Sequence, residues 1–400
     1  MKGWFIAVTA GRWQLCGIKA AKRLGYKVVA IDSDINAPGF EYADEHICCG
    51  FENVQSIINY LSNKSIVGCL SICSDAGMLL AGKLIDHFNL SGPGLNVSKR
   101  LTDKGLQREA WQNAGIHNPK FYVGNQLQDL INRTRDFNFP LIIKPVDSAG
   151  SRGITKIHNQ SELTKACLDN AISYSKRRQV IIEEFVTGQE YTVETIICNG
   201  KIHLLAITKK YKLAETNYTV AYKLETAEIP IELQTKITQR IAHAYQTLEY
   251  YNGIGHAEII VSDDDKVVIV EVAGRGGGFL VFEEFLPRIS SLDIVELTVL
   301  QACGQPIEIT EKTEHYGILE FLPSSEGIVK NITGFKAVNT LPYCTSESFV
   351  AIGDKVKNAD CDGARLGYIL CCSDDKTLVR STVQKAKSLV KVEVARNESY

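Results

Sequence analysis

The sequence predicts a multidomain chain of mixed α/β and α+β class. Its 400 residues exceed the roughly 150 that one domain ordinarily takes, so two or three domains are expected. Strand-like and helix-like segments alternate over residues 1–97, which is typical of a doubly wound α/β domain. Strands with local hairpins over 98–305, and short strands with a closing amphipathic helix over 306–400, favour α+β regions.

The N-terminal α/β domain is expected because its strands are almost continuously apolar, as parallel strands buried on both faces are. Gly25 ends the first helical pattern. The expected elements, in order, are strand Trp4–Ala10, helix Gln14–Leu24, strand Lys27–Asp32, strand Gly68–Cys73 and helix Ala76–Phe88.

Beyond residue 97 the same hydrophobic patterns predict further helices and strands. In the middle region they predict helix Ser98–Ala114, strands Leu141–Lys144 and Ile154–Ile157, helix Ser161–Lys176, strands Val180–Phe185, Tyr191–Cys198 and Ile202–Lys209, helix Ile231–Leu248, and strands Gly255–Val261 and Val267–Ala273. In the last region they predict strands Tyr316–Phe321, Phe349–Ile352 and Gly367–Cys371 and helix Lys376–Val390.

The composition argues against several classes of partner. Basic residues number 44 and acidic residues 46, so the net charge of −2 gives no reason to expect nucleic acid or a membrane surface. No apolar run approaches the roughly 18 residues that a spanning helix needs, and the start of the chain lacks a signal peptide's apolar core. The 12 cysteines are scattered without any Cys-x-x-Cys, which predicts mostly buried, reduced thiols in a cytoplasmic protein.

Two apparent nucleotide motifs fail. The stretch from Gly77 to Lys83 imitates a phosphate-binding P-loop, but Leu84 stands where a hydroxyl must reach magnesium, and the segment has a helix-interior pattern. Asp32 ends the second strand, where a ribose-binding acid would lie in a dinucleotide fold. The glycine fingerprint is missing, so a pyridine-nucleotide oxidoreductase is a distant alternative.

A better candidate for phosphate binding is the loop from Lys144 to Gly153. Its sequence is Lys-Pro-Val-Asp-Ser-Ala-Gly-Ser-Arg-Gly, and a strand lies on each side of it. Small residues let backbone N–H groups fold over phosphates, and Lys144 adds a positive charge at the base. The alternative is a plain flexible hairpin.

The strongest signal is a pair of acids on a predicted hairpin. If Asp264 and Asp265 form the centre of the turn, Glu258 lies directly opposite Glu271. Two like charges there are destabilising unless a cation lies between them, and magnesium is commonly held by one or two carboxylates and substrate phosphates. Arg275 follows on the same face if the strand stays extended, which completes a set suited to phosphoryl transfer. The alternative is a solvated face with salt bridges.

A third piece is the apolar strand that starts at Val180 and ends in Glu183 and Glu184. Such a strand end can present backbone groups to an adenine edge, and Glu190 can accept hydrogen bonds from ribose hydroxyls. Taken alone, the pattern favours a strand end with solvated acids over a nucleotide-binding segment.

Together and in this order, these pieces resemble the ATP-grasp superfamily. The resemblance covers roughly residues 1–310, and Gly353-Asp354 with Arg365-Leu-Gly-Tyr368 resemble the small end domain of carboxylate–amine ligases such as L-amino acid ligases. The stretches that carry it are Ala10-Gly-Arg, Gly25–Asp32, Asp34–Gly39 with Tyr42–Asp44, Thr102–Lys104, Pro140–Pro145 with its glycine loop, Ile182–Glu190, Gly255–Glu258 and Glu271–Gly278.

The resemblance implies an ATP-grasp domain over 98–305, with a mobile lid at about 119–187, and a role for each matching residue. The implied ATP-binding residues are Lys104 and Lys144 for the phosphates, Ser148, Ser151 and Gly153 in the closing loop, Glu183, Glu184 and Val186 for adenine, and Glu190 for ribose. Glu258 and Glu271 would bind Mg²⁺, or Mn²⁺ in its place, and Arg275 would act on the transferred phosphoryl group. Ala273 departs from the family, which often has Asn there, and this puts the second metal's coordination in doubt.

The resemblance therefore implies an ATP-dependent carboxylate–amine ligase that works through an acyl phosphate on small-molecule substrates. The alternatives are a bicarbonate-activating carboxylase or carbamoyl-phosphate-type enzyme, and a non-catalytic ATP-binding module. Arg12, His256 and Arg288 are candidates to contact the substrates, since their charge could pair with a carboxylate. A homodimer is compatible with the sequence, which identifies neither the acid nor the amine.

Overall fold

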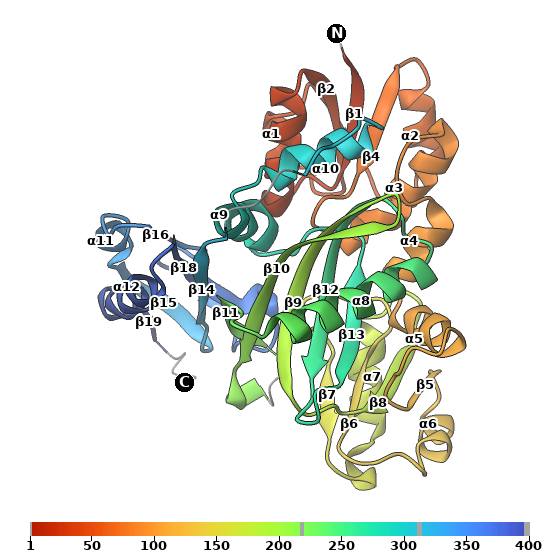
Figure 1. The fold of residues 1–400 in the computed structure, drawn as a ribbon, viewed down its shortest axis with the longest axis vertical. Helices are drawn as coiled ribbons and strands as arrows, with labels where there is room; N and C mark the ends of the chain where they lie inside the picture. Colours follow the sequence, from red (N-terminus) through yellow and green to blue (C-terminus); the bar gives the residue numbers. More distant parts are fainter. Residues whose placement is uncertain (1, 217–219, 310–313, 396–400) are drawn as a thin grey trace.

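The computed structural model describes residues 2–216, 220–309 and 314–395; residues 1 and 396–400, which the expected domain limits include, lie outside this range. Four β-sheets organise the described part of the chain (Figure 1). No helix among the described residues is long and apolar enough to cross a membrane.

The first sheet confirms the predicted N-terminal α/β arrangement. Its strands are parallel and lie in the order β3-β2-β1-β4. Ile6 and Val8 of β1 face one apolar cluster and Phe5 and Ala7 the other, so the sheet is buried on both faces. The bounds are β1 Lys2–Val8, α1 Leu15–Arg23, β2 Tyr26–Asp32, β3 Glu45–Cys48, α2 Val54–Leu61, β4 Ile66–Leu70 and α3 Asp75–Phe88.

A second sheet of eight strands forms the middle of the molecule, in the order β13-β12-β9-β10-β11-β14-β18-β16 (Figure 1). It does not end at residue 305, because β14 pairs with β11 and carries the sheet into the C-terminal region. The bounds are β9 Gln189–Cys198, β10 Lys201–Lys212, β11 Ala221–Thr226, β12 Gly253–Val261, β13 Val267–Ala273, β14 Tyr316–Pro323, β16 Cys344–Ser348 and β18 Arg365–Ser373.

Helices cover this central sheet and join it to the N-terminal one. In Figure 1, α10 lies beside α1 at the N-terminal sheet, far from the strands that precede it in sequence. Its buried Val295 and Val299 share an apolar cluster with Phe5. The bounds are α8 Ile231–Thr247, the π-helix Val281–Phe285, α9 Leu286–Ser290 and α10 Ile294–Ala302.

The third sheet, β5-β8-β6-β7, forms the region where the lid is expected, at the lower right of Figure 1. Its apolar cluster includes Leu141, Ile143, Val180 and Ile182, so it has a small core of its own. The bounds are β5 Phe121–Gly124, α6 Leu127–Arg133, β6 Leu141–Pro145, β7 Thr155–Ile157, α7 Lys165–Ser173 and β8 Val180–Glu184.

Two predicted helices near this sheet are interrupted. The expected helix Ser98–Ala114 is α4 Leu95–Leu101 followed by α5 Lys104–Asn113. The break arises because the Asp103 side chain accepts a hydrogen bond of 2.9 Å from the backbone N–H of Leu106 and so caps a new helix. Likewise Thr164 caps α7, which shortens the expected helix Ser161–Lys176.

A fourth, small sheet lies at the C-terminal end beside α12 Lys376–Leu389, with the strand order β17-β15-β19. The predicted strand Phe349–Ile352 is wrong, because Phe349 packs on the rings of Trp13 and Tyr368 just beyond the end of β16. The remaining bounds are β15 Gly327–Thr333, α11 Phe335–Val338, β17 Lys355–Val356 and β19 Lys391–Ala395.

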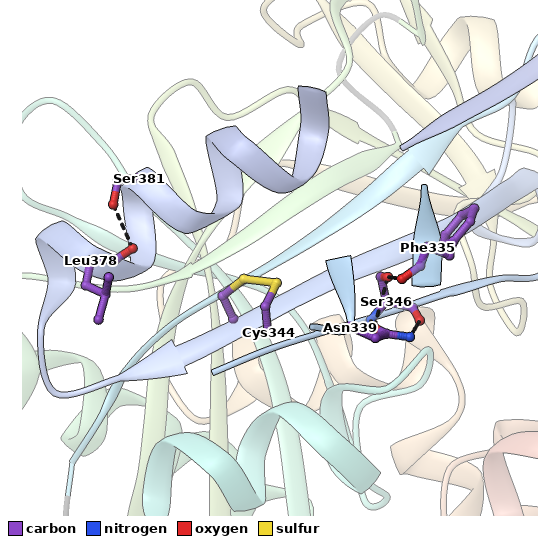
Figure 2. The surroundings of a disulfide bond; sticks show 7 residues. Phe335, Asn339, Cys344, Ser346, Leu378 and Ser381 are labelled. Carbon is purple, nitrogen blue, oxygen red and sulfur yellow. Dashed lines mark hydrogen bonds between the residues drawn. A yellow bond between two sulfur atoms is a disulfide. The ribbon is translucent and has the colours of Figure 1, made fainter. Parts of the chain in front are cut away.

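The cysteine prediction needs correction. Cys344 of β16 and Cys371 of β18 face each other across antiparallel strands and are joined by a disulfide bond, shown from Cys344 in Figure 2. The other ten cysteines are free, but only Cys69 and Cys303 are buried, and Cys48 is exposed. Sequence spacing does not reveal the pair, because its members are 27 positions apart in the sequence and are brought together only by the pairing of β16 with β18.

Candidate functional site

Two neighbouring cavities open between the central sheet and the lid sheet. The larger has a volume of about 900 Å³ and the smaller about 540 Å³. They share a wall, to which both Glu258 and Glu271 contribute. Volumes of this size suit small-molecule ligands, so the pair of acids lies where two ligands would meet.

The predicted pairing of these acids is confirmed: Glu258 of β12 lies opposite Glu271 of β13. The turn is not centred as predicted, since Val261 pairs with Val267, and a bulge that skips Val270 restores the expected register. The backbone carbonyl of Val270 instead accepts a hydrogen bond of 2.9 Å from Arg108. A bulge beside a site is a common way to aim a side chain.

Two lysines neutralise the pair of acids. Lys104 Nζ lies 2.7 Å from Glu271 Oε2, and Lys210 Nζ lies 2.7 Å from Glu258 Oε1. Burial alone would raise the pKa of Glu258, but the charges of Lys210 and His256 outweigh it and hold that pKa well below its ordinary value. Glu258 is therefore set to stay ionised, as a carboxylate ligand of a divalent cation must be.

The donor set fits one magnesium site completed by other ligands. Within the described residues no group of three or more His, Cys, Asp or Glu side chains could hold a metal ion. Two carboxylates alone match the way magnesium is usually bound, with waters and substrate phosphates filling the remaining positions.

Arg275 lies just beyond β13 and lines the larger cavity. Its Nε and Nη2 each donate a hydrogen bond of 2.8 Å to the carboxylate of Asp75, the first residue of α3. Burial alone would lower the pKa of Arg275, but the charges of Asp75 and Glu271 outweigh it and raise that pKa. This bidentate pair fixes the orientation of the guanidinium at the wall of the larger cavity.

The smaller cavity is built around a buried ionic network. Lys144 Nζ lies 2.5 Å from Glu183 Oε1, and Arg108 Nε lies 2.9 Å from Glu183 Oε2. The carboxylate predicted to hold adenine is thus occupied by two cations. We infer that Glu183 positions Lys144 for the phosphates.

Replacing Glu183 with glutamine is expected to lower the free energy of unfolding at pH 7 by about 3–5 kcal/mol, since Lys144 and Arg108 would be left buried without their anion. Urea unfolding measures the loss. Burial alone would raise the pKa of Glu183, but Arg108 and Lys144 lower it from 4.5 to about 2. The stabilisation is therefore present above pH 4.5 and is lost as the pH falls toward 2. If the difference in free energy of unfolding between the wild type and Glu183→Gln stays constant down to pH 2.5, this account is contradicted.

The other predicted nucleotide residues line the same cavity except Gly153, which is not among the described residues that line either cavity. Glu184, Val186, Glu190, Ser148 and Ser151 all line it. The Glu184 carboxylate accepts hydrogen bonds from Asn138, at 2.8 Å from the Asn138 backbone N–H and 3.0 Å from its side chain. The backbone N–H of Glu184 donates to the Lys120 carbonyl at 3.0 Å. Glu190 pairs with Lys210, at 2.9 Å, and with Lys212.

The glycine loop closes over both cavities. Lys104 Nζ donates a hydrogen bond of 2.8 Å to the backbone carbonyl of Ser148 and so ties the loop to the acids. Gly153 has a φ of +70°, and a Cβ added there would lie 2.8 Å from the ring of Tyr174, so glycine is required at this bend.

Of the three residues predicted to contact the substrates, one lines a cavity and two do not. His256 lines the larger cavity, with Nδ1 2.5 Å from Glu194 Oε1. Burial alone would lower its pKa, but Glu194 and Glu258 raise it to about 9, so the ring carries a charge at pH 7. Among the described residues that line the two cavities, neither Arg12 nor Arg288 appears. Arg12 pairs with Glu347 and Arg288 with Glu284.

Several residues of the site were missed by sequence reasoning. Lys210 and Lys212 could have been found, because they alternate with Tyr211 on a strand that was predicted to end at Lys209. Asp75 and Arg108 carry no local signal, since their partners Arg275 and Glu183 lie 200 and 75 residues away. Asp362 and Arg365 reach the site only through the continuous central sheet.

Comparison with known proteins agrees with this geometry. Residues 137–283 match the ATP-grasp domain, and residues 320–395 match the L-amino acid ligase C-terminal domain 2. The chain is 29% identical over 220 residues to D-alanine–D-alanine ligase of Pseudomonas entomophila (strain L48), which covers 52% of this chain and 66% of that protein. It is 23% identical over 401 residues to dapdiamide A synthase of Enterobacter agglomerans, covering 93% and 92% of the two chains.

The fold agrees as well. The crystal structure of L-amino acid ligase from Bacillus licheniformis superposes with a TM-score of 0.85 at 18% identity, over 98% of this chain and 99% of that one. The resemblance predicted from the sequence is thereby confirmed. The chain thus carries an ATP-grasp domain followed by an L-amino acid ligase C-terminal domain.

Proposed function

We propose that the protein is an ATP-dependent carboxylate–amine ligase. The observation that supports this most is the position of Glu258 and Glu271 on the wall shared by the two cavities. ATP would occupy the smaller cavity, and the acid and the amine the larger one. The relatives named as ligases and synthases support the same type of reaction.

The reaction would proceed in two transfers. An oxygen of the substrate carboxylate attacks the γ-phosphorus of ATP, which forms a C–O–P linkage and breaks the bond to ADP. The amine nitrogen then attacks the carbonyl carbon, inorganic phosphate leaves with the C–O electron pair, and the nitrogen loses a proton to solvent. The products are an amide, ADP and phosphate.

The residues of the site would act by positioning and by neutralising charge. Lys104 and Lys144 line the smaller cavity, where they would contact phosphate oxygens, and Arg275 lines the larger cavity, where it would contact the transferred phosphoryl group. Mg²⁺, or Mn²⁺ in its place, held by Glu258 and Glu271, would supply further charge neutralisation. No covalent nucleophile is needed, since positioning and electrostatics carry most phosphoryl transfers.

The test is an assay of ATP-dependent phosphate release over all pairs of L-amino acids, with mass spectrometry of the products. We expect at least one pair to give a dipeptide and phosphate in equal amounts. Phosphate release that requires bicarbonate and gives no amide would instead identify a bicarbonate-activating enzyme. ATP binding without turnover under every condition would favour a non-catalytic module.

The glycine loop should become ordered when nucleotide binds. Residues 147–153 join two short strands, and backbone with little apolar anchoring exchanges its amide protons readily. Hydrogen exchange should slow at least about tenfold in this loop when a non-hydrolysable ATP analogue is added, because the ligand would fix its N–H groups. The loop Ser262–Lys266 serves as an internal control, since it lines neither cavity. Equal exchange of the glycine loop in both states would show a rigid structural turn.

A further inference from the structure

Arg365 is a buried arginine whose charge the protein does not fully satisfy. It begins β18, is 8% exposed and lines the larger cavity. Its guanidinium carbon lies 3.6 Å from the ring centroid of Phe321 and 4.7 Å from that of Phe279. The two aromatic rings therefore hold the flat guanidinium in place at the cavity wall.

The hydrogen bonds of Arg365 use only one of its three nitrogens. Nη2 donates to the backbone carbonyl of Ala221 at 3.0 Å and to Asp362 Oδ1 at 2.8 Å. Nε is enclosed and unpaired. Nη1 makes no hydrogen bond with any residue in the described ranges, yet it does not belong to the enclosed unpaired atoms, so its N–H groups remain for a ligand.

Arg275, in the same cavity, shows what a satisfied arginine looks like. All three of its nitrogens donate, to the Asp75 carboxylate and to the carbonyl of Gly276. Its pKa is raised by Asp75, whereas burial lowers the pKa of Arg365 and outweighs the opposing charge of Asp362. Buried charges ordinarily have partners, so the open donors of Arg365 indicate an anion that is missing from the protein itself.

The location narrows the identity of this anion. Arg365 lines the larger cavity, but it is not among the described residues that line the smaller, nucleotide-side one. The reacting carboxylate must lie at the shared wall beside Glu258 and Glu271. An anion at Arg365 therefore belongs to a ligand of the larger cavity rather than to ATP.

We propose that Arg365 is a specificity-determining residue that binds the unreactive carboxylate of the amine substrate. This proposal rests on the ligase function proposed above. The amine substrate would then be an amino acid, whose carboxylate is kept in the product. The carboxylate of Asp362 accepts a hydrogen bond from Arg365. The backbone N–H of Asp362 donates a hydrogen bond of 3.2 Å to the carbonyl of Gly150 in the glycine loop.

The experiment measures binding without turnover. Each L-amino acid and its carboxamide, which lacks the ionised carboxylate, are titrated calorimetrically into the full-length protein saturated with ADP and Mg²⁺. The wild type should bind at least one amino acid ten times or more tightly than its carboxamide. In Arg365→Met, which keeps the apolar stem between the two rings, this preference should disappear while ADP affinity stays unchanged.

A matched control is Arg380→Met. Arg380 also stacks on an aromatic ring, that of Tyr316, and pairs with two glutamates, but it lines neither cavity among the described residues. It should keep the preference, and thermal unfolding should show both variants to be folded. If neither ligand class binds the wild type, if carboxamides bind as tightly as acids, or if Arg365→Met keeps the preference, the assignment of Arg365 is overturned.

This result is separable from the ligase proposal. An Arg365-dependent preference without any amide product would leave the binding role standing and refute the ligase. An active ligase whose preference for the acid is unchanged in Arg365→Met would support the ligase function and refute the binding role of Arg365.

Discussion

Replacing Glu271 with glutamine is expected to lower the rate of ATP-dependent phosphate release by at least about 100-fold, because charge stabilisation by a bound metal is worth several kcal/mol. The glutamine keeps the shape of the side chain but removes the charge that faces Lys104 and the shared wall. Strand β13 should persist, since its backbone pairing with β12 does not depend on the Glu271 side chain. Steady-state phosphate release at saturating ATP and Mg²⁺ measures the effect.

Glu228→Gln is the matched control. Glu228 also pairs with two cations, Lys376 and Arg380, but its side chain is 49% exposed and away from both cavities. Its removal should change turnover less than twofold, as expected for an exposed ion pair. Near-normal turnover in Glu271→Gln would refute the assignment of the two acids to the metal.

Replacing Arg275 with lysine is expected to lower kcat by about 10–1000-fold while ATP affinity changes only a few fold, as for the loss of an interaction that acts mainly in the transition state. Lysine keeps the positive charge but cannot bind Asp75 through two nitrogens and still offer donors to a phosphoryl group. Single-turnover kinetics and equilibrium binding of an ATP analogue separate the two quantities.

A second variant distinguishes the catalytic role of Arg275 from the positioning role of Asp75. Asp75→Asn leaves Arg275 in place but removes the carboxylate that fixes it. It should lower kcat less than Arg275→Lys does. Weak ATP binding with normal turnover at saturation in Arg275→Lys would instead make this arginine a ground-state contact.

The elements that were predicted correctly are those determined by the local pattern of apolar and polar residues. The strands around Val28 and Ile143 are continuous apolar segments, and strand alternation with a short polar turn sufficed to place Glu258 opposite Glu271. The pairing of Glu258 with Glu271 was predicted correctly only because two errors cancel. The turn is centred half a residue away from the predicted position, and the bulge at Val270 corrects the register.

What sequence could not predict depends on tertiary contacts. The helix break at Asp103 is a capping choice that a helical pattern conceals, and it is this break that places Lys104 at a helix start. The carboxylate of Glu183 was expected to face adenine, but it pairs with Arg108 of helix α5. The role of Arg365 becomes visible only when β14 and β18 are seen to extend the central sheet to the cavity.

The central claim is that a substrate carboxylate is phosphorylated before the amine attacks. It is tested most directly with an acid substrate that carries ¹⁸O in both carboxylate oxygens, incubated with ATP, Mg²⁺ and the amine, followed by mass spectrometry of the released phosphate. The account predicts one ¹⁸O atom in each phosphate, transferred from the acid when the acyl phosphate breaks down. Phosphate free of ¹⁸O, released in step with the amide product, would contradict it.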